Sequence, residues 1–342
     1  LWGDFPVITT VADDITSENI DEVYPQYFPK QNTELEAYQQ IERDLLDAVQ
    51  YAPDNTPGNK TLFTKSVART LLAKIYAEKP LRDYTKVIQY CDEVKADGFD
   101  LVDDFSDLFG MNAAGTDAKM RNTKESILEA QFTSGAGNWC TWMFGRDLVN
   151  WNNNFTWAKW VTPSRDLISA FKQEGDEVRF KESIVYYDCN WSNYYPSDNY
   201  PFMYKCRSAN SSIIKYRYAD VLLLKAEALI MQDTPDLEGA ADIIDEVRDR
   251  AKLGALPTSV RSNKNVLLNA LLKERRLELA FEGQRWFDLV RLDKVEEVMN
   301  AVYAKDSGRK AQIYTFDKNS YRLPIPQSVI DANDKIHQNP GY

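Results

Sequence analysis

The spacing of apolar residues predicts a chain built mainly of α-helices. Over long stretches apolar positions recur every three to four residues, as they do on one face of an amphipathic helix. In residues 33–52, for example, Leu35, Ile41 and Leu45 fall on one stripe, and Pro53 follows the end of the helix. Further helices are predicted over residues 64–78, 84–95, 218–252 (a pair), 265–282 and 286–302.

The predicted helices come in similar pairs. In residues 64–95 a turn with Pro80 joins two helices, and the small Ala68 permits close approach between them. Residues 218–252 repeat the arrangement around Pro235. Such pairs resemble tetratricopeptide repeats, which bury their apolar faces only by stacking on neighbours. The pattern therefore predicts a mainly α-helical, single-domain protein of tetratricopeptide-like stacked helix pairs.

The composition changes between the helix pairs. There we expect a short strand over residues 127–132 and one clear helix over residues 164–173, within an irregular, aromatic-rich loop subdomain. The expected division is a helix-pair scaffold over about residues 33–110 and 213–342, a variable ligand-binding subdomain over about 126–212, an extended connection over 1–32 and an irregular strap over 311–342.

The middle region holds the residues that best fit a ligand site. Six of the eight tryptophans lie between positions 139 and 191, among tyrosines and asparagines. Aromatic rings stack on the apolar faces of sugars while amides bind the hydroxyls, and the same mixture suits any site with an apolar wall and a few polar groups. The alternative is that these rings form a core, because a loop-rich subdomain needs large buried side chains.

The favoured ligand-binding segments are residues 151–154 and 191–195, where polar turn residues flank the rings and place them on loops. Trp157 and Trp160 stand three apart and are predicted to pack instead. The predicted ligand-binding residues are Trp139, Trp142, Trp151, Asn153, Trp191, Asn193, Tyr194 and Tyr195.

Charge narrows the range of partners. The formal net charge is −11, whereas a nucleic-acid binder needs a basic stripe on its surface. The same balance disfavours an anionic membrane surface and fits a neutral ligand better. No apolar run approaches the 18 residues of a transmembrane helix.

The sequence offers little for catalysis. Its single histidine, His337, lies in the predicted strap, so serine and cysteine triads would all depend on that residue. Neither a metal-binding spacing nor a glycine-rich phosphate loop is present. We therefore predict a protein that is not an enzyme and that has no cofactor and no catalytic metal site, and a structural calcium stays an open alternative. A glycosidase stays an alternative, since it needs only two suitably placed carboxylates.

The four cysteines, Cys91, Cys140, Cys189 and Cys206, fit no zinc motif. Cys91 lies on a predicted helix and is expected to be a buried thiol. Cys189 and Cys206 flank a loop rich in tyrosine, asparagine and proline. A disulfide between them is one possibility in an extracytoplasmic protein.

The most informative segment is residues 274–289, with the sequence ERRLELAFEGQRWFDL. Its arginines stand one helical turn from its acidic residues, which predicts a packed helix pair with a salt-bridged rim. Gly283 costs roughly 1 kcal/mol against alanine in a helix, so it indicates a close backbone approach or a break. Trp286 is predicted to be structural.

This segment resembles the C-terminal signature of the SusD/RagB family of surface nutrient-binding lipoproteins. Two further segments match the family in the same order. They are RYADVLLLKAEA at residues 217–228, and LPIP at 323–326 followed by QNPGY at 338–342. The resemblance covers most of the chain from Gly3 onward and is weakest over residues 135–212.

The resemblance implies a SusD-like helical fold and a cell-surface lipoprotein that captures a polysaccharide or oligosaccharide. It also implies delivery of that glycan to a SusC-like TonB-dependent outer-membrane transporter. Membrane attachment would come only from a lipid anchor, and we expect the lipidated cysteine and the first helices to precede Leu1. The alternatives are a peptide-capturing member of the family and a helical-repeat scaffold for protein interactions.

Overall fold

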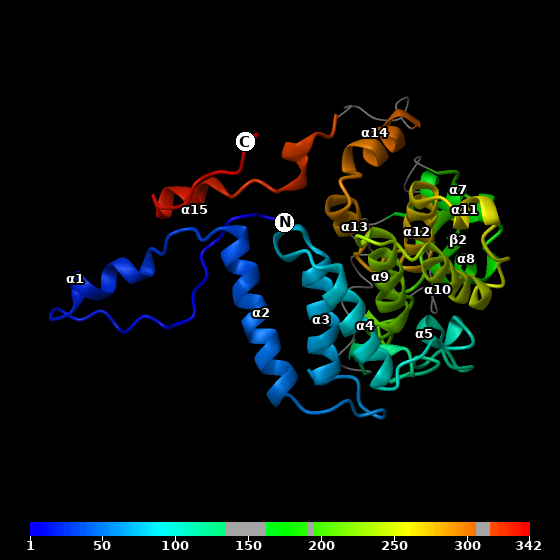
Figure 1. The fold of residues 1–342 in the computed structure, drawn as a ribbon, viewed down its shortest axis with the longest axis horizontal. Coiled ribbons are helices and arrows are strands. Elements are labelled where there is room, and N and C mark those ends of the chain that lie inside the picture. Colours follow the sequence, from blue (N-terminus) through cyan, green and yellow to red (C-terminus); the bar gives the residue numbers. More distant parts are fainter. Residues whose placement is uncertain (134–161, 190–194, 306–314) are drawn as a thin grey trace. The chain divides into compact units, whose positions relative to one another are not determined.

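The computed structural model describes residues 1–133, 162–189, 195–305 and 315–342 (Figure 1). The chain forms two compact units. The larger unit comprises residues 47–77 and 83–285, and the smaller comprises residues 1–46, 78–82 and 286–342. The predicted division into one scaffold and one ligand-binding subdomain stays a prediction.

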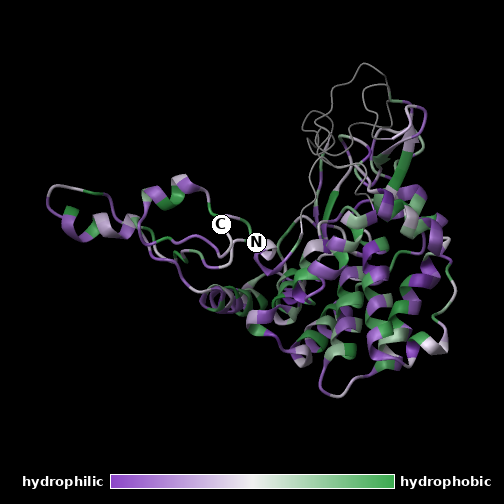
Figure 2. Cartoon of the chain, turned by 90° about the horizontal axis from the view of Figure 1, so that it is seen from above, coloured by the Kyte–Doolittle hydropathy of each residue, from purple (hydrophilic) through white to green (hydrophobic). Residues whose placement is uncertain are grey.

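The larger unit is built around helix α9 (Tyr218–Met231), which contacts every other long helix of the unit. These are α3 (Lys65–Ala77), α4 (Tyr84–Ala96), α10 (Leu237–Arg250) and α12 (Lys264–Glu278). Most of the α9 residues are buried, as expected of a helix that is apolar on all sides. The surrounding helices carry both apolar and polar residues (Figure 2). The two helix pairs predicted over 64–95 and 218–252 are thereby confirmed.

Small residues allow this packing, and polar side chains define where the helices begin. Ala68, Ala73 and Ala226 have no exposed surface, so neighbouring backbones approach closely. Asp83 caps the first turn of α4 and Asp236 that of α10, because each carboxylate accepts a backbone N–H. The helix boundaries therefore follow from local sequence.

The described residues of the region between the helix pairs contain more helices and strands than predicted. It contains the expected strand β1 (Ser126–Ala130), which pairs antiparallel with β4 (Ile213–Arg217), and the expected helix α7 (Arg165–Glu174). It also contains α8 (Glu177–Ser183) and an antiparallel hairpin of β2 (Ile184–Tyr187) and β3 (Tyr200–Met203). Two short helices, α5 (Ser106–Phe109) and α11 (Thr258–Arg261), also belong to the larger unit.

The longest helix of the smaller unit among the described residues is α2 (Glu34–Tyr51), whose last residues belong to the larger unit. Its other elements are α1 (Ile20–Val23), η1 (Tyr24–Tyr27), η2 (Lys79–Leu81), α13 (Arg285–Arg291), α14 (Val295–Lys305), η4 (Lys318–Tyr321) and α15 (Gln327–Ala332). The single helix predicted over 286–302 is wrong. Asp293 adopts a φ of 55°, which ends α13 and separates it from α14.

The backbone of the signature segment leaves the helical conformation before Gly283. Helix α12 ends at Glu278, and both Phe281 and Gly283 adopt positive φ, 66° and 79°. A Cβ built on Gly283 would meet no atom within 4 Å. The glycine is therefore explained by its left-handed backbone rather than by a close approach.

Three acidic residues of the signature, Glu274, Glu278 and Asp288, are buried rather than placed on a solvent-facing rim, so the predicted rim is wrong. Glu278 has no exposed surface and pairs with Arg217, Arg250 and Arg179. Burial opposes ionisation of Glu278, but the three guanidinium groups outweigh it and hold its pKa well below the usual range. The arginines come from β4, α10 and α8, so one carboxylate joins three elements.

Two further carboxylates extend this network. Glu125, which directly precedes β1, accepts hydrogen bonds from Arg217 over 2.7 Å and from Arg250 over 2.6 Å. Lys205 donates to Glu282 over 2.6 Å and to the Glu278 carbonyl over 2.8 Å. Burial lowers the pKa of Lys205 to about 8, against the opposing attraction of Glu282.

The possible disulfide between Cys189 and Cys206 is not formed. The β2–β3 register explains why. Cys189 follows Tyr187 at the loop end of the hairpin, whereas Cys206 follows Met203 at the opposite end. The paired strands separate them by about 10 Å at 3.3 Å per residue, beyond the ~7 Å Cα separation that a disulfide tolerates. Cys91 is buried, as predicted.

Candidate functional site

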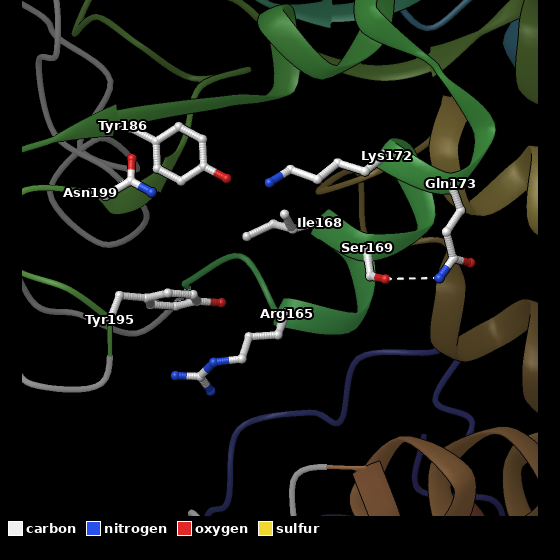
Figure 3. A pocket seen from close by; sticks show the side chains of 8 residues that line it. All are labelled: Arg165, Ile168, Ser169, Lys172, Gln173, Tyr186, Tyr195 and Asn199. Carbon is white, nitrogen blue, oxygen red and sulfur yellow. Dashed lines mark hydrogen bonds between the residues drawn. The ribbon is translucent and has the colours of Figure 1, made fainter.

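An open pocket of about 420 Å³ lies where α7 faces the β2–β3 hairpin (Figure 3). This volume falls within the usual range of small-ligand sites. Of the described residues, eight line it: Arg165, Ile168, Ser169, Lys172, Gln173, Tyr186, Tyr195 and Asn199. We call it the α7 pocket.

Helix α7 supplies one wall because its sequence is strongly two-sided. Leu167, Ile168 and Phe171 are buried in the hydrophobic cluster under the hairpin. Arg165, Ser169 and Lys172 recur at the four- and three-residue steps of one helical face and line the pocket. Ser164 caps the start of the helix and Gly175, in the left-handed region, ends it.

Ion pairs hold both ends of α7 against the scaffold. Asp166 in the first turn pairs with Arg276 of α12 over 2.7 Å. Glu174 in the last turn pairs with Arg248 of α10 over 2.7 Å and with Lys273 of α12. Two basic residues of α12, one of them in the signature, therefore position the helix that forms the pocket wall.

Tyr195 is a fixed part of the pocket. Its hydroxyl donates a 2.7 Å hydrogen bond to the Pro163 carbonyl, and its ring meets the Tyr200 ring edge-on at a centroid distance of 5.6 Å. The Arg165 guanidinium lies over the ring, 4.5 Å from its centroid. These three contacts hold the ring and the guanidinium in place before any ligand binds.

Tyr186 and Asn199 provide the more open polar groups. Tyr186 is half-buried on β2, and burial raises the pKa of its hydroxyl, which stays a neutral hydrogen-bonding group. Its hydroxyl and the Lys172 ammonium point toward one another across the pocket (Figure 3). Asn199 is exposed and offers both an amide donor and an amide acceptor. Ser169 accepts a 3.0 Å hydrogen bond from Gln173.

The pocket overlaps the predicted site at one residue, Tyr195. The other predicted residues, Trp139, Trp142, Trp151, Asn153, Trp191, Asn193 and Tyr194, lie outside the described residues, as do Trp157, Trp160 and Cys140. Their roles stay predictions. The prediction missed the contribution of α7, although the two-sided pattern of residues 165–172 was a usable signal.

The single histidine does not line the α7 pocket. His337 is exposed, and its backbone N–H and carbonyl both bond the Gln31 side chain. In the part of the chain that the structure describes, no group of histidine, cysteine and carboxylate side chains could hold a metal ion. In the same part, no helix is both long and apolar enough to cross a bilayer.

The fold defines the class, a mainly α-helical protein of tetratricopeptide-like helix pairs. Residues 195–342 match the model of the SusD family. The SusD-like protein P2 of Formosa agariphila is 28% identical over 391 residues, which cover all of this chain and 70% of that protein. These matches support a SusD/RagB family protein.

Solved structures show the same fold. A laminarin binding SusD-like protein superposes with a TM-score of 0.70 at 24% identity, covering 99% of this chain and 74% of that one. Surface glycan-binding protein A from Bacteroides thetaiotaomicron, in complex with laminarihexaose, gives a TM-score of 0.70 at 19% identity, covering 91% of this chain and 72% of that one. At these identities the likeness establishes the fold alone.

Proposed function

We propose that this protein binds a polysaccharide or oligosaccharide nutrient and that the α7 pocket is part of its binding site. The observation that carries the proposal is the composition of the pocket. A ring held in place at Tyr195 and a half-buried ring at Tyr186 stand beside the Asn199 amide and the Ser169 hydroxyl. Rings cover the apolar faces of a sugar, and amides and hydroxyls bind its hydroxyl groups.

The comparisons support the same class of ligand. Two proteins with this fold are named for binding laminarin or were solved with laminarihexaose bound. Family members are binding proteins rather than enzymes, and our proposal is that this protein too binds without chemistry.

The family also supports a place for the protein in the cell. We propose that it acts at the cell surface as an outer-membrane lipoprotein and delivers its glycan to a SusC-like TonB-dependent transporter. In this scheme the helical scaffold supplies the contact with the transporter. The predicted middle-region residues, from Trp139 to Tyr194, would add further rings to the site.

Native affinity electrophoresis through gels that contain soluble polysaccharides tests the proposal. We expect at least one polymer to retard the protein. Tyr186→Ala and Asn199→Ala should each reduce the affinity, by about tenfold for the loss of one stacked ring. Tyr51→Ala removes a tyrosine that is 76% exposed at the end of α2 and is the matched control.

Two results would contradict the proposal in different ways. If no polymer retarded the protein and a peptide library bound instead, the glycan assignment would be wrong. If a polymer bound but neither pocket variant weakened binding, the ligand class would stand and the α7 pocket would not be the site.

A further inference from the structure

The two ends of helix α7 are tied to the scaffold in different ways. At the C-terminal end, Glu174 pairs with Arg248 over 2.7 Å, and Arg248 also pairs with the buried Glu274 over 3.2 Å. Glu274 in turn accepts a 2.6 Å hydrogen bond from Arg179, which also binds Glu278. A chain of ion pairs therefore connects this end of α7 to the charges buried in the core.

The N-terminal end of α7 is tied to α12 through Arg276. The Arg276 guanidinium lies 2.7 Å from the carboxylate of Asp166, in the first turn of α7. The two side chains keep 20% and 15% of their surface exposed. Loss of such a pair leaves no fully buried charge without a partner, which is the costly case. Removal of Arg276 is therefore expected to loosen this end of the helix without unfolding the protein.

The residues beside Asp166 hold a ring of the pocket. Arg165 directly precedes Asp166, and its guanidinium lies 4.5 Å from the centroid of the Tyr195 ring (Figure 3). Pro163 accepts the 2.7 Å hydrogen bond from the Tyr195 hydroxyl. Both contacts of Tyr195 are made by the three residues that precede Asp166. A shift of the first turn of α7 therefore moves the contacts that hold the Tyr195 ring.

We propose that Arg276 is a positioning residue of the α7 pocket. Through Asp166 it holds the first turn of α7, and through that turn it fixes the Tyr195 ring on which a sugar stacks. Arg276 itself is not among the described residues that line the pocket. The inference rests on the proposed function and gives a residue of the 274–289 signature a role in ligand affinity.

The exposure of the ion pair sets the size of the effect. The apparent affinity of a ligand falls with the fraction of molecules whose site is in the binding arrangement. Partly exposed ion pairs change such an equilibrium by no more than about fivefold. Arg276→Gln is therefore expected to weaken glycan binding by about two- to fivefold, less than the loss of a stacked ring.

Affinity electrophoresis of the full chain through gels with laminarin, soluble starch or xylan measures this effect. The polymer that retards the wild type most is used to compare Arg276→Gln, Arg276→Lys and Arg261→Gln. Arg261→Gln is the matched control, because the Arg261 side chain is 15% exposed and pairs with Asp245. It lies on α11 and is not among the described residues that line the pocket. Urea unfolding of each variant reports the stability of the fold.

We expect weaker binding in Arg276→Gln and wild-type binding in Arg261→Gln. Arg276→Lys should restore most of the affinity, because an ammonium also pairs with the Asp166 carboxylate. Raising NaCl from about 50 to 500 mM should weaken binding by the wild type toward the level of Arg276→Gln, since salt screens a pair that contacts solvent.

Hydrogen exchange gives a readout that needs no ligand. The amides of Leu167 and Ile168 donate to the Ser164 hydroxyl and carbonyl at the start of α7. Their exchange should become about two- to fivefold faster in Arg276→Gln. The amide of Gly175, which donates to the Lys172 carbonyl at the other end, should exchange as in the wild type.

Equal exchange of the Leu167 and Ile168 amides in the wild type and Arg276→Gln would overturn the inference and leave glycan binding intact. Unchanged affinity of Arg276→Gln would do the same. A loss of stability in Arg276→Gln far beyond that of Arg261→Gln would make the role of Arg276 structural and would also overturn the inference. Absence of retardation of the wild type by every polymer would instead overturn the proposed function, and the role of Arg276 in binding with it.

Discussion

Arg217 and Glu282 are joined by two hydrogen bonds, from Nε to Oε2 over 2.7 Å and from Nη2 to Oε1 over 2.8 Å. Arg217 ends β4 and Glu282 follows α12, 65 residues further along the chain. A bidentate pair of this kind fixes the relative orientation of its two elements. Two of the family-like segments, RYADVLLLKAEA and the 274–289 signature, therefore interact through their charged residues in the core.

The buried network leads to a prediction for Glu278. Glu278→Gln leaves Arg217, Arg250 and Arg179 without their shared counter-charge, and breaking a buried pair costs about 3–5 kcal/mol. We expect urea unfolding to show a loss of this size. Glu238→Gln is the control, since Glu238 pairs with Arg261 while 72% exposed, and it should change stability by no more than ~0.5 kcal/mol. Similar losses in both variants would mean that burial does not determine the cost.

Asp220 gives a prediction about pH. Although burial favours its neutral form, Lys74 and Arg275 lie at 2.7 and 2.8 Å and hold the pKa of Asp220 below its usual range. A carboxylate with a lowered pKa adds stability above its unfolded pKa of about 3.9, and this stability is lost as pH falls toward the folded pKa. Asp220→Asn lacks that contribution.

The measurement compares urea unfolding of the wild type and Asp220→Asn at pH 7, 5, 4 and 3. We expect the stability difference between them to be largest at pH 5–7 and to shrink below pH 4. A difference that stayed constant over this range would show that Asp220 does not change its proton binding on folding.

Gly283 gives a prediction about backbone strain. Its φ of 79° disfavours a side chain, although a Cβ there would touch nothing within 4 Å. Gly283→Ala should therefore destabilise the fold by about 1 kcal/mol through strain alone. Gly254 also has an open environment but no positive φ, so Gly254→Ala should be neutral or slightly stabilising. Equal melting temperatures for the two variants would contradict this explanation.

Alkylation can test whether Cys189 and Cys206 form a disulfide. Alkylation of unfolded, unreduced protein followed by peptide mass mapping should label Cys91, Cys189 and Cys206. A peptide pair linked through Cys189 and Cys206 would contradict the hairpin register, because that register places the two residues at opposite ends.

The sequence predicted the candidate site only in part. Tyr195 was identified because the loop around it is rich in aromatic and polar residues, and it lines the pocket. Arg165 and Lys172 were missed because the sequence shows which residues are neighbours along the chain but does not show which face of a helix packs against the hairpin. The absent disulfide has the same origin, since the pairing of β2 with β3 separates two cysteines that the sequence places on either side of one loop.

By itself, the sequence determined the helix pairs over residues 64–95 and 218–252 and indicated an unusual backbone at Gly283. These depend on the spacing of apolar side chains and on local backbone preferences, which act over a few residues. Only the tertiary structure decided which charges meet. Arg179 binds Glu274 across 95 residues, and α7 presents its basic side to the pocket because the scaffold pairs with its acidic side. Burial and charge pairing depend on which segments come together in space, and that is a property of the whole fold.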